Sequence, residues 1–291
     1  MLKQIIAFIV ALLLFSSCSS DYDKRLKIST TTWVGYTPLF YAQEKGWLKP
    51  LNIKLINVSS LAENMYLYQS GASDAYVGTQ YEYETLHADM KTLQPIMMFD
   101  RSNGGDLVMG NLSILDLQST DEEIDVYLEL DSINNILLKD FLVRYKLQNK
   151  KINYLNTDQT QIKLLKMRTK PTLIVTYIPY NVELQKRGFL ELASTKENLD
   201  LLVIDAMFTK NELFYAHKKQ FIELKKLVDK SIDDLHNDSR AFYEIIKPYL
   251  HNISYDEFKN SLHDIIWINK DLPVEFKSRL RDGKFPIRDL I

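Results

Sequence analysis

Short β-type runs alternate with helix-type segments along most of this chain. In the first part, the β-type runs are Leu26 to Thr31, Ile53 to Val58, Ala75 to Val77 and Leu93 to Phe99. Helices are expected between them because Thr37-Pro38 is a typical helix start, and Ser60-x-x-Glu63 and Thr79-x-x-Glu82 have the pattern of capping boxes. Strands that alternate with helices predict a mostly parallel, doubly wound α/β sheet.

The same alternation restarts after Gly110. Its β-type runs are Ile124 to Leu130, Ile152 to Leu155, Leu173 to Tyr177 and Leu201 to Asp205. Between them, Asp131 and Asp158 are expected to cap two helices, and Pro179 to begin a third. This second series predicts a second α/β lobe.

The rest of the chain is predicted to be nearly all helical. Helices are expected from Lys210 to about Leu235 after a Thr209-x-x-Glu212 box, from Arg240 to Leu250, and from Tyr255 after Ser254-x-x-Glu257. Helices in so long a run must bury their apolar faces against another part of the protein. The simplest arrangement is that they pack on the first lobe. We therefore expect lobe one at residues 26–110 and 203–291 and lobe two at 111–202. Two chain crossings, near 107–113 and 197–207, would form a hinge.

The first residues are typical of a secretory signal. Lys3 is followed by an apolar run from Ile5 to Phe15 and then by small residues before Cys18. The run is shorter than the about 20 apolar residues expected of a membrane span. Leu14 to Cys18 resembles the bacterial lipobox, which implies a signal peptide at 1–17, lipid attachment at Cys18 and a tether at 18–25. The chain would then be exported and held on the outer side of a bacterial membrane by lipid only. The alternative is a chance cysteine in a cleaved signal.

Composition excludes several classes of protein. Cys18 is the only cysteine, so an internal disulfide and a cysteine zinc cluster are excluded. The net charge of −2 gives no general attraction to nucleic acid. The five histidines lack paired metal-ligand spacing, and there is no G-x-S-x-G elbow, P-loop or H-E-x-x-H. We expect a monomeric protein that is not an enzyme and takes no cofactor or metal.

The stretch from Thr31 to Gly46, TTWVGYTPLFYAQEKG, resembles the opening of the ABC-transporter solute-binding proteins for nitrate, sulfonates, taurine and thiamine precursors. In that family a strand ends in a W-x-G-Y-x-P turn that leads into a helix closing with A-x-E-x-G. The stretches at 71–75, 102–106 and 175–181 resemble later parts of the family in the same order. The resemblance spans Leu26 to Leu224. It implies a two-lobed type II periplasmic-binding fold, a ligand in the cleft and delivery to an ABC permease.

Candidate binding residues follow from position, because ligands of open α/β sheets sit beyond the carboxyl ends of the strands, facing helix N-termini. In lobe one these residues are Thr32, Trp33, Gly35, Tyr36, Thr79, Gln80, Arg101, Ser102 and Asn103. In lobe two they are Asp131, Ser132, Asn135, Tyr177 and Tyr180. The rings of Trp33 and Tyr36 would stack on a flat ligand, and Gly35 would let the backbone approach it.

Each candidate also has a simpler interpretation. Thr79 and Asp131 are good helix caps without any ligand. Trp33 could close the core, Arg101 could be a solvated loop charge, and Gly35 could serve the turn alone. These alternatives stay open at the level of sequence.

The leading hypothesis for function is solute capture for an ABC importer. A ligand-sensing lipoprotein that reports to a membrane receptor or kinase is the alternative. A third reading, a lipoprotein that uses the fold for protein contacts only, predicts that aromatic side chains fill the cleft themselves.

Two ligand classes fit the candidate residues. A sulfonate or nitrate would use converging N–H groups and Arg101. A thiamine-precursor-like aromatic heterocycle would use Trp33, Tyr36, Tyr81 and Tyr177, with Glu82 or Asp100 meeting an amino group. Rings outnumber cations among the candidates, which favours the heterocycle.

Overall fold

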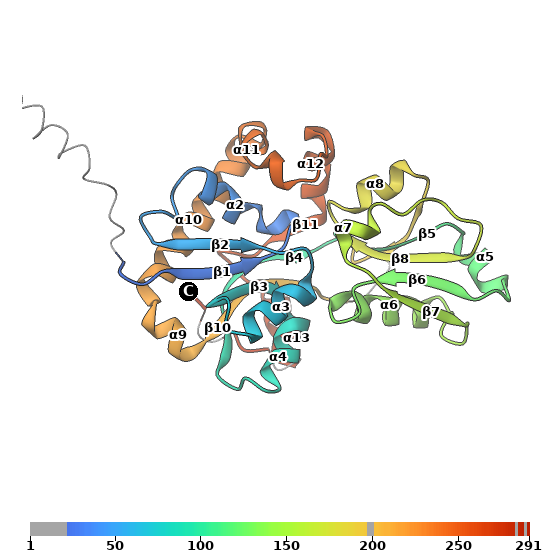
Figure 1. The fold of residues 1–291 in the computed structure, drawn as a ribbon, viewed down its shortest axis with the longest axis horizontal. Coiled ribbons are helices and arrows are strands. Elements are labelled where there is room, and N and C mark those ends of the chain that lie inside the picture. The colour runs from blue at the N-terminus through green and yellow to red at the C-terminus, as the bar shows by residue number, and fades with distance from the viewer. Residues whose placement is uncertain (1–21, 197–200, 283–284, 288–289) are drawn as a thin grey trace, which may run out of the picture.

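The computed structural model describes residues 22–196, 201–282, 285–287 and 290–291. They form two lobes, each built around its own β-sheet (Figure 1). The expected signal peptide at 1–17, Cys18 and residues 18–21 of the expected tether lie outside the described residues. In the part of the chain that the structure describes, no helix is both long and apolar enough to cross a membrane.

Within the described residues, the sheet of lobe one has six strands. Their spatial order is β11 (Ile265–Trp267), β4 (Leu93–Ser102), β10 (Ile204–Lys210), β3 (Ala75–Thr79), β1 (Leu26–Thr30) and β2 (Ile53–Asn57). β1 pairs in parallel with β2 and β3, whereas β10 pairs antiparallel with both β3 and β4, and β11 antiparallel with β4. β1 to β4 therefore share one direction, which confirms the prediction of a mostly parallel sheet.

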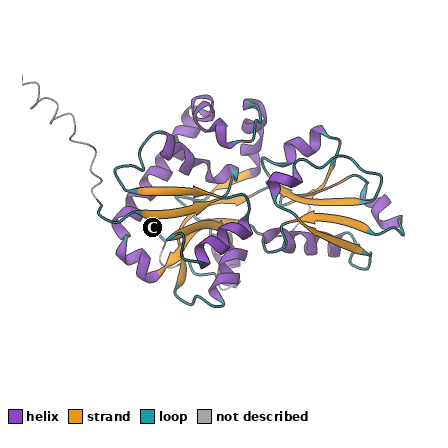
Figure 2. Ribbon diagram, in the orientation of Figure 1, coloured by secondary structure: helices purple, strands orange, loops and turns teal. Residues whose placement is uncertain are grey.

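Helices cover both faces of this sheet (Figures 1 and 2). They are η1 (Val34–Tyr36), α2 (Thr37–Glu44), α3 (Leu61–Gln69), α4 (Gln80–His87), α9 (Asn211–Ala216), α10 (Lys218–Asn237), α11 (Ser239–Ile246), η2 (Lys247–Tyr249), α12 (Tyr255–Ser261), η3 (Leu262–Asp264) and α13 (Val274–Asp282). α10 and α11 pack with α2 on one face, where Phe221 and Phe242 share a buried cluster with Phe40. α3, α4 and α13 lie on the other face. The C-terminal helices thus return to lobe one as expected.

The sheet of lobe two has five strands among the described residues. Their order is β7 (Ile152–Asn156), β6 (Ile124–Leu128), β8 (Thr172–Tyr177), β5 (Asp106–Gly110) and β9 (Leu190–Ser194). β6 is parallel to β7 and β8, and β5 runs antiparallel to β8 and β9. α5 (Ile114–Ser119) and α6 (Ile133–Arg144) cover one face. α7 (Gln159–Ile162) and α8 (Asn181–Lys186) cover the other.

The first chain crossing lies earlier than the sequence suggested. β4 of lobe one ends at Ser102 and β5 of lobe two begins at Asp106, so the chain passes between the lobes at residues 103–105. The expected boundary at residue 110 is therefore wrong, because 106–110 form a strand of the second sheet. No helix separates β4 from β5, so the alternation of helices and strands gave no signal there. The chain returns between Ser194 and Ile204.

Two expected helix starts are also corrected. Ser132, not Asp131, caps α6, since its hydroxyl accepts from the N–H of Asn134. Thr209 lies inside β10 and donates to the carbonyl of Asp74, so it does not cap a helix. The expected helix from Lys210 begins at Asn211 instead and is divided at His217 into α9 and α10. The capping boxes at Thr79 and Ser254 are confirmed.

Candidate ligand-binding cleft between the lobes

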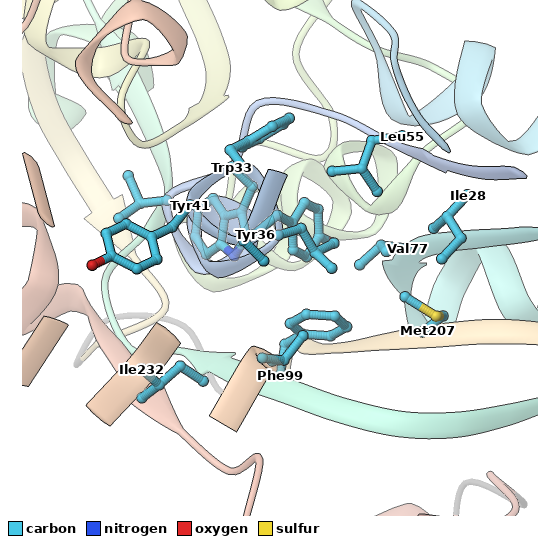
Figure 3. Packing of buried hydrophobic residues seen from close by; sticks show 14 of the residues in the cluster. Ile28, Trp33, Tyr36, Tyr41, Leu55, Val77, Phe99, Met207 and Ile232 are labelled. Carbon is cyan, nitrogen blue, oxygen red and sulfur yellow. The ribbon is translucent and has the colours of Figure 1, made fainter. Parts of the chain in front are cut away.

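The two lobes are closed against each other. The main buried cluster of lobe one also contains Ile133, Tyr177, Ile178 and Tyr180 of lobe two. The rings of Trp33 and Tyr177 meet edge to face across the boundary, 5.9 Å between centroids. Figure 3 shows Trp33 and Tyr36 among buried hydrophobic side chains, with Phe99 close by.

A small cavity remains where the lobes meet. It is lined by Thr31, Trp33, Tyr36, Leu61, Thr79, Val203 and Asp205 of lobe one and by Asp106 and Tyr177 of lobe two. Its volume of about 10 Å³ is room for about one water molecule. The hydroxyls of Thr31 and Tyr177 are buried and have no hydrogen-bond partner within the described residues. Aromatic side chains therefore occupy most of the cleft, yet polar groups beside them are unsatisfied.

Asp100 and Asp205 form a buried carboxyl pair on one side of the cavity. A β-bulge between β4 and β10 sets two residues of β4, Phe99 and Asp100, opposite Asp205. The indole N–H of Trp33 donates to Asp100 Oδ1 over 3.1 Å, and the hydroxyl of Tyr36 donates to Asp205. Burial raises the pKa of Asp100 to about 8, and burial together with the charge of Asp100 raises the pKa of Asp205 well above its usual range. The pair can hold a proton between them at neutral pH.

Gly35 is needed for this arrangement. A Cβ atom at Gly35 would lie 2.0 Å from Asp100 Oδ2 and 2.4 Å from Trp33 Nε1. The glycine was expected to let the backbone approach a ligand. In the structure it lets the backbone approach the carboxylate of Asp100.

Asp106 supplies a third carboxyl from lobe two. It begins β5, directly after the first crossing, where its N–H donates to the hydroxyl of Ser102 over 3.0 Å. Burial raises the pKa of Asp106 to about 7. The cavity is thus flanked by Asp205 on one lobe and Asp106 on the other.

Two glutamates connect the lobes at helix N-termini. Glu82 of lobe one accepts from the N–H of Ile133, the first residue of α6, over 3.1 Å. Glu129 of lobe two accepts from the N–H of Leu61, the first residue of α3, also over 3.1 Å. Burial raises the pKa of both carboxyls, that of Glu129 to about 8. Each glutamate also accepts a hydrogen bond from its own lobe. Glu82 accepts from the N–H of Thr79, and Glu129 accepts from the N–H of Gln159.

Five buried carboxyls therefore surround the cleft without a cationic partner. They are Glu82, Asp100, Asp106, Glu129 and Asp205. None of them forms an ion pair with a lysine, arginine or histidine of the residues described. Buried charges are normally paired, so this concentration of acid is unusual.

Comparison with known proteins rests on structure alone, since no known sequence family and no curated protein sequence matches the chain. The ligand-binding component of an ABC-type import system from Staphylococcus aureus, solved with zinc, superposes with a TM-score of 0.70 at 14% identity and covers 90% of this chain and 92% of its own. The alkanesulfonate-binding protein of Xanthomonas axonopodis pv. citri, solved with MOPS, gives 0.70 at 10% identity, with 89% and 91% covered. A Candida albicans protein described as having the generic periplasmic binding protein fold gives 0.64 at 12% identity, with 85% and 83% covered.

The chain has the periplasmic binding protein fold. In this fold the cavity lies between the two lobes, and four of the expected site residues line it: Trp33, Tyr36, Thr79 and Tyr177. Thr32 and Tyr180 lie just outside, where Tyr180 interacts with Thr32 and with His251. Thr79 caps α4 and also lines the cavity.

The other expected residues serve the framework of the periplasmic binding protein fold. Gln80 binds the backbone of Leu202 and Ile204 at the start of β10. Arg101 donates to Asn103 and lies over the ring of Phe276, and it does not line the cavity. The remaining residues lie at the first crossing, namely Ser102 and Asn103, or near the start of α6, namely Asp131, Ser132 and Asn135.

Sequence reasoning missed Thr31, Leu61, Asp106, Val203 and Asp205 as lining residues. One signal could have found Asp106 and Asp205. Asp205 interrupts an apolar β-type run in Leu-Val-Ile-Asp-Ala, as Asp100 does in Met-Met-Phe-Asp, and Asp106 opens such a run. An acidic residue inside a buried strand indicates either a paired charge or a binding site.

A second hollow lies at the outer side of the lobe boundary. It has a volume of about 440 Å³ and includes Lys186, Lys196, Glu257 and Asp264 among its lining residues. Here the charges satisfy each other, because Lys186 pairs with Glu257 over 3.0 Å and Lys196 with Asp264 over 3.6 Å. Asn181 Oδ1 also lacks a hydrogen-bond partner here among the residues described. The buried carboxyls without a cationic partner therefore distinguish the inner cavity as the candidate site.

Proposed function

We propose that this chain is the solute-binding protein of an ABC importer and captures a small molecule by closure of its two lobes. The observation that carries the proposal is the inner cavity, whose lining comes from both lobes and whose polar groups are left without partners. Clefts between domains are preferred binding sites for small ligands. Two of the similar structures are described as the ligand-binding component of an import system and as an alkanesulfonate-binding protein.

Closure is the mechanism that follows from this arrangement. When the lobes separate, the contact between Trp33 and Tyr177 breaks and the cleft opens to solvent. A ligand that touches Asp205 on one lobe and Asp106 on the other would draw the lobes together and be shielded from water. The closed form would then dock on the permease. The chain needs no catalytic group for this task.

Export and anchoring are part of the same proposal. The signal-like residues 1–17 and the lipobox-like stretch that ends at Cys18 would place the protein outside the cytoplasmic membrane, held by lipid at Cys18. The lobes would then stay close to the permease. A sensing lipoprotein would use the same closure with a receptor as its partner.

A second candidate function has one observation in its favour. Trp33, Tyr36 and Tyr177 fill most of the cleft, as expected of a lipoprotein that uses the fold only to contact other proteins. The buried carboxyls argue against this protein-contact function. A cleft that only has to stay closed would be more stable with apolar side chains in the place of these carboxyls.

Native mass spectrometry tests the proposal. The purified protein is incubated with a low-molecular-mass extract of bacterial cells, desalted and measured without denaturation. One small molecule per chain is expected, and its occupancy should fall in Trp33→Ala and stay unchanged in Trp47→Ala, which alters a tryptophan of the same lobe away from the cavity. A bare chain under all extract conditions would support the protein-contact function instead.

A further inference from the structure

The charge around the inner cavity narrows the class of ligand. Asp205 and Asp106 line the cavity from opposite lobes, and Asp100 lies directly behind Asp205. Glu82 lies within electrostatic reach of Asp106 and Asp205, and Glu129 lies within reach of Glu82. In the described part of the chain no cationic side chain pairs with any of them. The missing counter-charge must come from protons or from a bound molecule.

We propose that the ligand is an organic cation, such as an amine or an amidine, that bridges Asp205 of lobe one and Asp106 of lobe two. This inference rests on the proposed function and specifies the chemistry of the same cleft. The cation takes the place of a proton on the aspartate pair, and that proton leaves to solvent. Binding and closure are then one event, because the bridged carboxylates lie on different lobes.

The helix N-termini at the lobe boundary argue against an anionic ligand. A helix N-terminus with free N–H groups is the usual place for an anion. Here the first N–H groups of α3 and α6 already donate to Glu129 and Glu82 from across the boundary. The chain's own carboxylates therefore occupy the positions that a sulfonate or nitrate would need, and they would repel it.

Two unpartnered hydroxyls provide independent evidence of a polar ligand. Tyr177 Oη and Thr31 Oγ1 belong to residues that are 2% and 1% exposed, and neither has a hydrogen-bond partner among the residues described. Both residues line the same cavity as the aspartates. A hydroxyl can accept a hydrogen bond from an ammonium or amidinium N–H as well as donate one. An N–H-rich ligand would therefore satisfy carboxylates and hydroxyls together.

The aromatic walls fit the organic part of such a ligand. Trp33, Tyr36 and Tyr177 all face the cavity, and the faces of these rings attract cations. An inorganic ion would be attracted less by these rings than an organic cation would. In the described residues, no group of three or more acids or histidines is arranged to hold a metal. Because the closed cavity is small, the ligand enters while the lobes are apart and the rings of Trp33 and Tyr177 separate around it.

A set of probes matched in shape and differing in charge tests the inference. The purified protein is heated with benzylamine, benzyl alcohol or benzoate, with benzamidine or benzamide, and with nitrate, methanesulfonate or zinc chloride. Melting temperatures are recorded for each, and affinities by calorimetry for those that stabilise. We expect a higher Tm with the cationic members only, because they alone supply the missing charge.

Variants locate the effect. Asp205→Asn and Asp106→Asn keep the size of the side chain. Each should lower the affinity for the cationic probe by at least about 30-fold. The control Asp233→Asn alters an exposed aspartate on α10 that pairs with Lys270, and it should leave the affinity unchanged. Calorimetry in buffers of different ionisation enthalpy should show proton release on binding, which the Asp205→Asn variant loses.

The outcomes separate the two proposals. Stabilisation by benzoate, nitrate, methanesulfonate or a neutral probe, or by zinc alone, overturns the organic cation and leaves solute capture standing. Equal affinity in the wild type and both cavity variants also overturns it. No stabilisation by any probe overturns the inference, and an empty mass spectrum after exposure to extract would then overturn the proposed function as well.

Discussion

Glu82 and Glu129 lie on opposite lobes, and each accepts a hydrogen bond from the first N–H of a helix in the other lobe. The two bonds, both 3.1 Å long, tie α6 to lobe one and α3 to lobe two. Such bonds exist only while the lobes are together. They form a reciprocal capping pair that favours the closed form without a ligand.

Removal of one member of this pair should open the protein. In Glu129→Ala, the N–H groups of Leu61 and Gln159 lose their acceptor, at a cost of about 1 kcal/mol per cap. We expect a larger radius of gyration in small-angle X-ray scattering. Glu123→Ala, which removes an exposed carboxylate of the same lobe paired with Lys170, serves as the control. An unchanged radius in Glu129→Ala would show that the capping pair does not hold the lobes.

Stability should fall as the pH rises from about 4 to about 8. An unfolded aspartate has a pKa near 3.9, whereas burial raises the pKa of Asp106 to about 7. The folded state therefore binds the extra proton, so the stabilisation is complete below about pH 4 and is lost as the pH rises through 7. Asp100 and Glu129, with pKa values of about 8, act in the same sense.

The groups that face Asp106 are Ser102, Glu82, Asp100, Asp205 and Tyr177, and none of them is cationic. Between pH 6.5 and 8.5 we expect a loss on the order of 2 kcal/mol, or about 5 °C in Tm. Burial lowers the pKa of His251 to about 4, so its opposite contribution is confined to lower pH. Asp106→Asn should show a smaller decrease. A Tm that is flat or rises over this range would contradict the assignment of uncompensated carboxyls.

Gly35→Ala should destabilise the protein strongly. The new methyl group would lie 2.0 Å from Asp100 Oδ2, and relief requires both Asp100 and Trp33 to move. We expect a loss of about 2–3 kcal/mol in denaturant unfolding. Gly71→Ala provides a contrast, because that site has open space but a φ of +77°, and we expect a loss of about 1 kcal/mol there. Equal losses at the two sites would mean that the contact at Gly35 is readily relieved.

Cys18→Ser should release the protein from membranes. A lipidated Cys18 would hold the chain in the membrane fraction of the producing bacterium, and the serine variant cannot be lipidated. Fractionation with immunoblotting, and the mass of the N-terminal peptide, measure this directly. A wild-type chain found entirely in the soluble fraction would favour a chance cysteine in a cleaved signal.

The sequence predicted those features that depend on neighbouring residues. The capping boxes at Thr79 and Ser254 and the cap at Asp158 were confirmed because each is a local pattern within four residues. Sequence alone does not separate Asp131 from Ser132, because both are good helix caps and they are adjacent. In the structure Ser132 caps the helix, and Asp131 accepts a hydrogen bond from the hydroxyl of Tyr66 on the other lobe.

The sequence could not predict features made by distant pairing. β5, β9 and β11 are short strands held by antiparallel partners far along the chain, and β5 follows β4 with no helix between them. The carboxyl pair is a similar case. Asp100 and Asp205 are more than one hundred residues apart, and only the bulged pairing of β4 with β10 brings them together. The turn that holds Trp33 and Tyr36 is contiguous and is a candidate on sequence alone, as is Asp100 for one ligand class, whereas Asp205 is not.

Closure on a solute is the central claim, and a direct test is single-molecule fluorescence transfer between the lobes. Dyes are placed at Lys49→Cys in lobe one and Asn149→Cys in lobe two, both exposed, in a Cys18→Ser background. Addition of low-molecular-mass cell extract, or of a stabilising amine, should raise the population with the lobes together, and Asp205→Asn should abolish the shift. A transfer distribution that no small molecule alters would contradict the account.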